Sequence, residues 1–222
     1  MRNKILIISD HAMTTSGVAT QSRHLIEGLL QTQKYNIVQL GAAVRHQSYM
    51  TQDITDHFKI IPCNGFGNKD IIRSLLVKEK PDVMIIFTDP RFFEHIFEME
   101  DEIHQVCPII YWHVWDNRPT PYFNKKYYDA VDKIVAISKL TEAVCKDIVP
   151  HKTVYIPHTL PKDIYFQLEE ERITTCKVNT LGEARKDNFV ALWLNRNSRR
   201  KRASDVLKAW QIFLFNLENK NK

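Results

Sequence analysis

The feature that most constrains this chain is the alternation of short apolar runs with segments whose apolar residues recur at helical spacing. Residues 5–8 are all apolar, which is typical of a strand buried on both faces of a parallel sheet. We expect this first strand at residues 4–9. Comparable runs predict strands at residues 35–40, 58–61, 83–87, 108–112, 133–138 and 153–156.

The segments between these runs have the pattern of amphipathic helices. After the first run, apolar residues recur from Val18 to Leu29, and Ser16 stands just ahead as a candidate N-cap. Further helices are expected around residues 71–76, 92–103 and 139–148. This alternation predicts an α/β fold in which helices cover a doubly wound, mostly parallel, Rossmann-like sheet.

The 222 residues exceed one such domain but do not complete a second. We expect a Rossmann-like domain at residues 1–180, a linker at 181–188, and the first strand and helix of a second domain at 189–222. That strand is expected at 189–194. Because one strand and one helix cannot enclose a core, the second domain is expected to be truncated.

Composition excludes several classes of protein. With 44% hydrophobic and 26% charged residues, the chain has the profile of a soluble globular protein. Its apolar runs are far shorter than the roughly 20 residues of a membrane-spanning helix, and the first is too short for a secretory signal. We therefore expect a cytoplasmic protein. The four cysteines form no C-x-x-C pair, so neither a zinc site nor a disulfide framework is expected.

Basic residues are concentrated near the C-terminus. Five of the seven residues at 196–202 are Lys or Arg, an excess equal to the whole net charge of +5. A patch of this kind attracts phosphate, whether in a nucleotide, a nucleic acid or a lipid head group.

Ligands of open α/β sheets bind at the carboxyl ends of the strands, which directs attention to the loops there. The first loop, residues 10–17, is polar and ends with Ser16 and Gly17 at a helix start. Backbone N–H groups at that position favour an anion, and a glycine permits close approach. An ordinary capped turn is the alternative, because the loop lacks the G-x-G-x-x-G and Walker patterns.

A second candidate loop, residues 113–124, follows the strand at 108–112. His113, Trp115 and Asp116 supply an imidazole, an aromatic face and a carboxylate, which together suit a sugar. For the aromatic residues the alternative is that they anchor a long loop to the core. No G-x-S-x-G, H-E-x-x-H or Walker lysine is present, which argues against serine hydrolases, zincins and P-loop ATPases.

The order of several modest motifs resembles the GT-B glycosyltransferases, more narrowly their retaining group 1 branch. The resemblance covers nearly the whole chain. It is carried by Ser16-Gly17, His113, and the segments 134–139, 154–158 and 195–202. It implies two Rossmann-like domains that face each other, with the acceptor held mainly by the first domain and the nucleotide sugar mainly by the second.

The resemblance also implies roles for individual residues. His113 would be the catalytic histidine near the transferred sugar, and Gly17 would lie near the donor diphosphate. Arg196 and Lys201 would neutralise the leaving diphosphate, which needs no metal or other cofactor. Ser16, Trp115 and Asp116 are expected on the acceptor and sugar side.

One departure from the family separates the functional hypotheses. The family's second domain carries two glutamates seven residues apart, and this chain ends before them. The first hypothesis is a fragment or split half of a glycosyltransferase, with a nucleotide sugar donor, a glycan, lipid or other acceptor, and a complementary C-terminal half as partners. The second is a non-catalytic acceptor-binding or scaffold protein. Nucleic-acid binding through residues 196–202 is a weaker third, so no nucleic-acid partner is expected.

Overall fold

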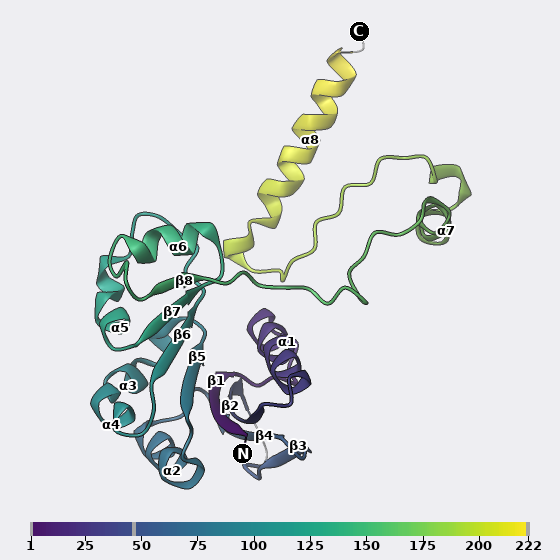
Figure 1. Cartoon of the computed structure of the whole chain (residues 1–222). Helices are drawn as coiled ribbons and strands as arrows, with labels where there is room; N and C mark the ends of the chain where they lie inside the picture. Colours follow the sequence, from purple (N-terminus) through teal and green to yellow (C-terminus); the bar gives the residue numbers. More distant parts are fainter. Residues whose placement is uncertain (1, 46–47, 221–222) are drawn as a thin grey trace. The chain divides into compact units, whose positions relative to one another are not determined.

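The computed structural model describes residues 2–45 and 48–220, and the chain divides into two compact units, Met1–Tyr165 and Phe166–Lys222. The first unit contains an eight-stranded sheet of order β3-β4-β2-β1-β5-β6-β7-β8 (Figure 1). All pairs of neighbouring strands in this sheet are parallel except β3 with β4. The strands are β1 (Asn3–Asp10), β2 (Tyr35–Val44), β3 (Gln52–Thr55), β4 (Phe58–Asn64), β5 (Val83–Phe87), β6 (Ile109–His113), β7 (Lys133–Ala136) and β8 (Thr153–Tyr155).

Helices lie on both faces of this sheet, so the predicted α/β, Rossmann-like fold class is confirmed (Figure 1). Helix α1 (Gly17–Gln31) packs on one face, where Ile26 joins a cluster with Ile5 and Ile7. The other face carries the larger cluster, which includes Leu6 and Ile8 of the same strand. The helices on that face are α2 (Lys69–Glu79), α3 (Glu94–Phe97), α4 (Glu100–His104), α5 (Lys125–Asp129) and α6 (Lys139–Lys146).

Local sequence signals set where the helices begin and end. Helix α1 (Gly17–Gln31) starts after Ser16, whose hydroxyl accepts a hydrogen bond from the Ala19 N–H at 3.0 Å. Helix α6 is capped in the same way by Ser138. Helix α2 ends at Lys80, which adopts a left-handed conformation (φ +47°) ahead of Pro81.

The structure differs from the sequence-based expectation at two places in the first unit. It contains an edge strand, β3, that was not predicted, because the polar sequence of β3 lacks a buried apolar run. In addition, the single helix expected at residues 92–103 is interrupted. Phe93 and Met99 both depart from helical backbone angles and both are buried, so the chain turns there to place them in the core. The pieces are the 3-10 turn η1 (Pro90–Phe92), α3 and α4.

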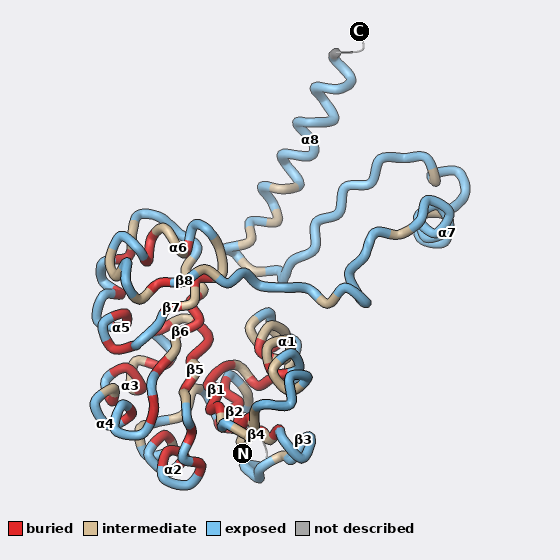
Figure 2. Tube along the Cα trace, viewed as in Figure 1, coloured by how far each residue is buried: buried red, intermediate tan, exposed pale blue. Residues whose placement is uncertain are grey.

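The second unit consists of helices and extended segments, and none of its described side chains is buried (Figure 2). Its elements are α7 (Glu170–Leu181), the 3-10 turns η3 (Glu183–Arg185) and η4 (Arg199–Lys201), and α8 (Ala203–Lys220). The strand expected at 189–194 is not a strand here, because no described segment pairs with its backbone. The predicted domain bounds of 1–180 and 189–222 stay predictions.

An apolar cleft of about 680 Å³ lies within this second unit. Trp193 on the extended segment and Trp210 and Phe213 on α8 are among its lining residues. These apolar side chains are partly or largely exposed, which is typical of a surface that another partner covers. Among the described residues, no helix is long and apolar enough to cross a membrane.

One glycine in the central sheet is required by packing. A Cβ at Gly41 of β2 would stand 2.7 Å from His11 Cδ2 and 2.9 Å from Ile60 Cγ2. We expect Gly41→Ala to lower the free energy of unfolding by about 1–3 kcal/mol, the usual cost of overpacking a core. Urea unfolding monitored by circular dichroism measures this loss.

Gly28 provides the matched control, because a Cβ at this α1 position meets no heavy atom within 4 Å. Gly28→Ala is expected to raise the free energy of unfolding by up to about 1 kcal/mol through helix propensity. Equal stability of Gly41→Ala and the unmodified protein would contradict the packing argument.

Candidate functional site

The sheet has a topological switch point between β1 and β5. From β1 the chain proceeds through α1 to β2 on one side, and after β4 it returns through α2 to β5 on the other side. The connecting helices lie on opposite faces there, and open α/β sheets bind ligands in the crevice outside the carboxyl ends of two such strands. The loops after Asp10 and Phe87 border this crevice.

The loop after β1 is fixed by a buried amide. The Gln39 side chain is fully buried, and its Oε1 accepts a hydrogen bond from the Ala12 N–H at 3.1 Å. Its Nε2 donates to Ser9 Oγ at 2.8 Å and to the Asp10 carbonyl at 2.9 Å. Because a buried amide is costly to leave unsatisfied, these bonds hold the loop in one conformation.

Ser16 and Gly17 lie at this edge, as predicted. Ser16 caps α1 and donates its hydroxyl proton to Asp10 Oδ2 at 2.5 Å. Apart from the adjacent residues and the backbone of α1, no heavy atom lies within 4 Å of the position that a Cβ on Gly17 would occupy. The N–H groups of Gly17 and Val18 belong to the first helical turn, which has no intrahelical acceptor for them. Open space, backbone donors and a carboxylate therefore meet at the start of α1.

His113, the predicted catalytic residue, lies inside the protein with 0% exposure. The Tyr111 hydroxyl donates a hydrogen bond to the Thr88 carbonyl (2.9 Å), so its oxygen accepts a hydrogen bond from the Nδ1–H of His113 (2.8 Å). This leaves His113 Nε2 to accept a hydrogen bond from the Tyr128 hydroxyl (2.7 Å). Burial lowers the pKa of His113 to about 3, while the charge of Asp89 acts in the opposite direction.

This arrangement changes the expected role of His113. Both ring nitrogens are used inside the protein, so the neutral imidazole has no atom left to bind a sugar hydroxyl. Through hydrogen bonds with Tyr111 and Tyr128, His113 links the ends of β5 and β6 to α5. No comparison tests the catalytic role of His113, which stays a prediction.

Asp89 lies at the same edge, just after β5. Apart from its position after a predicted strand, nothing in the sequence indicated a functional role for it. Its carboxylate accepts two hydrogen bonds from the Arg91 guanidinium, at 2.9 and 2.6 Å. Burial acts to raise the pKa of Asp89, but the hydrogen bonds and charge of Arg91 outweigh it and keep the pKa below its ordinary value. The crevice therefore has ionised Asp89 on its β5 side.

The aromatic loop after β6 is anchored at Trp115. The Trp115 indole donates to the Asn117 carbonyl at 2.9 Å, and the Trp115 carbonyl accepts the Thr141 hydroxyl proton at 2.7 Å. Asp116 next to it is exposed. Anchoring, the alternative considered from the sequence, accounts for Trp115, and the sugar-binding roles of both residues stay predictions.

A cluster of three rings lies on the α1 face at the carboxyl ends of β5 and β6. Phe87 and Trp112 are stacked with their ring centres 4.2 Å apart, and His158 stands edge-on to both. Thr159 accepts a hydrogen bond through its carbonyl from Gln21 Nε2 of α1 at 3.2 Å. The chain after β8 therefore returns to the edge where α1 begins.

Arg196 and Lys201, the predicted diphosphate ligands, belong to the second unit. Arg196 is exposed, and Lys201 is half-buried in the turn η4. Because the structure describes this unit by itself, it does not bring the two side chains together with Gly17. Their role in neutralising a diphosphate stays a prediction.

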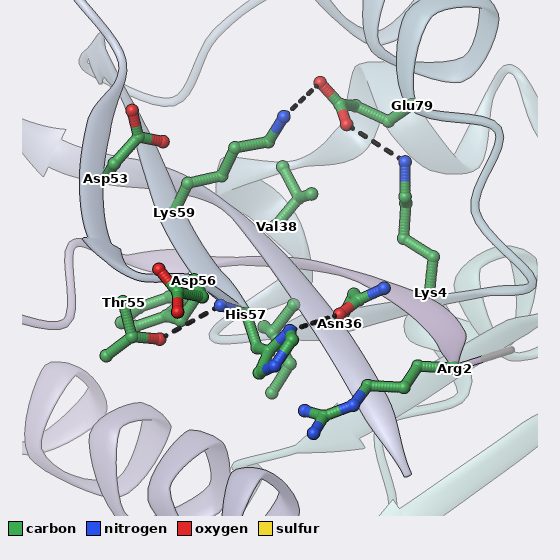
Figure 3. Close-up of a pocket in the computed structure, with 12 residues that line it drawn as sticks. Arg2, Lys4, Asn36, Val38, Asp53, Thr55, Asp56, His57, Lys59 and Glu79 are labelled. Carbon is green, nitrogen blue, oxygen red and sulfur yellow. Dashed lines mark hydrogen bonds and ion pairs between the residues drawn. The ribbon is translucent and has the colours of Figure 1, made fainter. Parts of the chain in front are cut away.

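A separate cleft of about 620 Å³ lies at the opposite edge of the sheet, near the amino ends of β1, β2 and β4. In Figure 3 the Glu79 carboxylate lies between Lys4 and Lys59, at 3.3 and 2.9 Å. Burial acts to raise the pKa of Glu79, but the two lysines outweigh it and lower the pKa.

The charges that line this cleft balance. Arg2, Lys4 and Lys59 stand against Asp53, Asp56 and Glu79, so the formal sum is zero before His57 is counted (Figure 3). The triad of Glu79 and its two lysines joins the end of α2 to β1 and β4. This cleft therefore has a structural explanation, and the crevice at the carboxyl edge is the stronger candidate. Among the described residues, no group of three or more His, Cys, Asp or Glu side chains is arranged to hold a metal ion.

Comparisons with known proteins leave the family open. No protein-family model matches the chain, and no curated protein matches it. One similar solved structure is dTDP-glucose 4,6-dehydratase from Bacillus anthracis str. Ames, determined in complex with NAD. It is 12% identical over 87% of this chain and 86% of that chain, with a TM-score of 0.41. A likeness this distant carries no functional inference, so the GT-B resemblance stays a prediction.

The buried His113 makes stability depend on pH. Its ordinary pKa of 6.5 falls to about 3 in the folded chain, so the unfolded chain binds more protons between these values. The contribution of neutral His113 to the free energy of unfolding is therefore fully present above pH 6.5 and is lost as the pH falls toward 3. We expect His113→Gln, which keeps a donor and an acceptor but does not titrate, to reduce the slope of unfolding free energy against pH by up to about 1.4 kcal/mol per pH unit.

The exposed His151 supplies the control, since His151→Gln is expected to keep the slope of the unmodified protein. Urea unfolding at several pH values between 7 and 4 gives the slopes. In the unmodified protein, the NMR signals of the His113 ring are expected to stay those of a neutral imidazole over the same range. Equal slopes for all three proteins, or a ring that protonates near pH 6, would contradict the argument.

Proposed function

We propose that the first unit binds a nucleotide sugar at the carboxyl edge of its sheet, and that the chain forms part of a glycosyltransferase. The observation that carries this proposal is the open space at Gly17, next to first-turn N–H groups and the Asp10 carboxylate. It lies at the switch point, where open α/β sheets bind ligands.

The chemistry of this edge favours a ligand with two kinds of group. First-turn N–H groups of a 15-residue helix favour a phosphate oxygen. The Asp10 carboxylate repels an anion but accepts hydrogen bonds from hydroxyl groups. A nucleotide sugar offers both phosphate and hydroxyl groups, whereas inorganic phosphate offers only the first. Selectivity for the nucleotide sugar over phosphate is therefore expected.

The more specific activity that we propose, transfer of the sugar to an acceptor, rests on the resemblance to GT-B glycosyltransferases. The alternative is a non-catalytic protein that keeps the ligand site and does not transfer sugar. Incubation with a radiolabelled nucleotide sugar separates the two, because a transferase releases nucleoside diphosphate when an acceptor is present. Binding without release over many hours favours the non-catalytic alternative.

Gly17 gives the proposal a direct test. Gly17→Leu adds a side chain at the start of α1 whose Cβ stands in open space, so folding is expected to be unaffected. We expect this variant to bind UDP-glucose at least about tenfold more weakly, a loss of about 1.4 kcal/mol. Isothermal titration calorimetry measures the affinity.

Gly28→Leu is the matched control, since it makes the same change at another open position of the same helix, away from the crevice. It is expected to retain the full affinity. Equal affinity of both variants would overturn the proposed site. Absence of binding by the unmodified protein to UDP-glucose and to GDP-mannose would overturn the proposed function itself.

A further inference from the structure

We infer that His158 and Trp112 form the wall of this crevice that binds the sugar of the ligand through hydrogen bonds. The inference rests on the proposed function, and it assigns the ligand-facing role to His158, in place of the buried His113. No sequence motif pointed to Trp112, and the segment containing His158 contributed to the family resemblance without a stated role.

The ring contacts place the two residues together. The His158 ring centre is 5.1 Å from that of Trp112 and 5.6 Å from that of Phe87, almost perpendicular to both rings. Phe87 and Trp112 are the last and the penultimate residues of β5 and β6. Both rings are buried, whereas His158 is exposed, so His158 is the member of the cluster that a ligand meets first.

A second contact places His158 near the start of α1. Its neighbour Thr159 is bonded to Gln21, which lies four residues after Gly17. Residues four apart in a helix lie one turn apart on the same face. The backbone directly after His158 is therefore bonded to the face of α1 that carries the open space at Gly17.

Trp112 supplies an observation that itself points to a ligand. The residue is 7% exposed, and its Nε1–H is itself buried and has no hydrogen-bond partner among the described residues. A buried donor of this kind is destabilising until it meets an acceptor. Because an indole N–H only donates, the group that satisfies it must offer a free lone pair, as a hydroxyl or ring oxygen of a sugar does.

The chemistry of the pair suits a sugar better than a phosphate. An imidazole both donates to and accepts from hydroxyl groups, and the indole donates to a hydroxyl or ring oxygen. Aromatic rings also pack against the C–H groups of a sugar. Nothing in this cluster carries a fixed positive charge, so the phosphate groups are expected at the start of α1 and the sugar at His158.

Affinity measurements test the inference. His158→Gln is expected to bind UDP-glucose about tenfold more weakly than the unmodified protein, with its affinity for UDP unchanged. His151→Gln is the control, because His151 is also exposed but precedes β8 and so lies at the opposite edge of the sheet. Unchanged UDP-glucose affinity in His158→Gln would overturn the inference.

NMR of the unmodified protein gives a readout that does not depend on a variant's folding. The indole N–H signal of Trp112, assigned by its absence in Trp112→Phe, is expected to shift with UDP-glucose and not with UDP. The Trp115 indole, already bonded to Asn117, is the internal reference and is expected to stay in place. A Trp112 indole N–H signal whose chemical shift does not change on addition of UDP-glucose would overturn the inference.

The outcomes separate this inference from the proposed function. If Gly17→Leu loses UDP-glucose binding while His158→Gln keeps it, the site stands and the assignment of His158 is wrong. If the unmodified protein binds no nucleotide sugar, both are wrong. Loss of binding in both variants, with the control variants unaffected, supports both.

Discussion

The rest of the first unit depends on the parallel pairing of β1 with β2 on one side and β5 on the other. Leu6, Ile7 and Ile8 of β1 are all fully buried, because α1 covers one face of the strand and the remaining helices pack on the other. The change of helix face at this strand opens the crevice at its carboxyl end. Burial of β1 and the position of the candidate site therefore have the same cause.

Buried polar groups then give that edge a defined shape. Gln39 holds the loop after β1, and His113 joins the ends of β5 and β6 to α5. Both side chains are buried. Gln39 fixes the loop after β1, which leads to Gly17, and His113 fixes the strand ends on the opposite face of the sheet.

The sequence predicted the architecture well because strands buried on both faces leave long apolar runs. All seven predicted strands of the first unit are present, and the cap at Ser16 begins α1 as expected. The edge strand β3 left no such run. The strand expected at 189–194 has the apolar pattern but no described segment to pair with, so pattern alone was insufficient.

The candidate site was harder to predict than the fold. A histidine after a strand is a signal for function, yet side chains alternate between faces along β6, and His113 points into the same core as Tyr111. Thr159, the neighbour of His158, is bonded to a helix more than 130 residues earlier, a contact that no local pattern encodes.

We expect a nucleotide sugar to bind at the carboxyl edge of the sheet and not in the charged cleft at the opposite edge. Amide chemical-shift changes on addition of UDP-glucose to the unmodified protein distinguish the two locations. The largest changes are expected at Gly17, Asp89 and Thr159. Changes confined to Asn36, His57 and Lys59, with the carboxyl edge unaffected, would overturn this location.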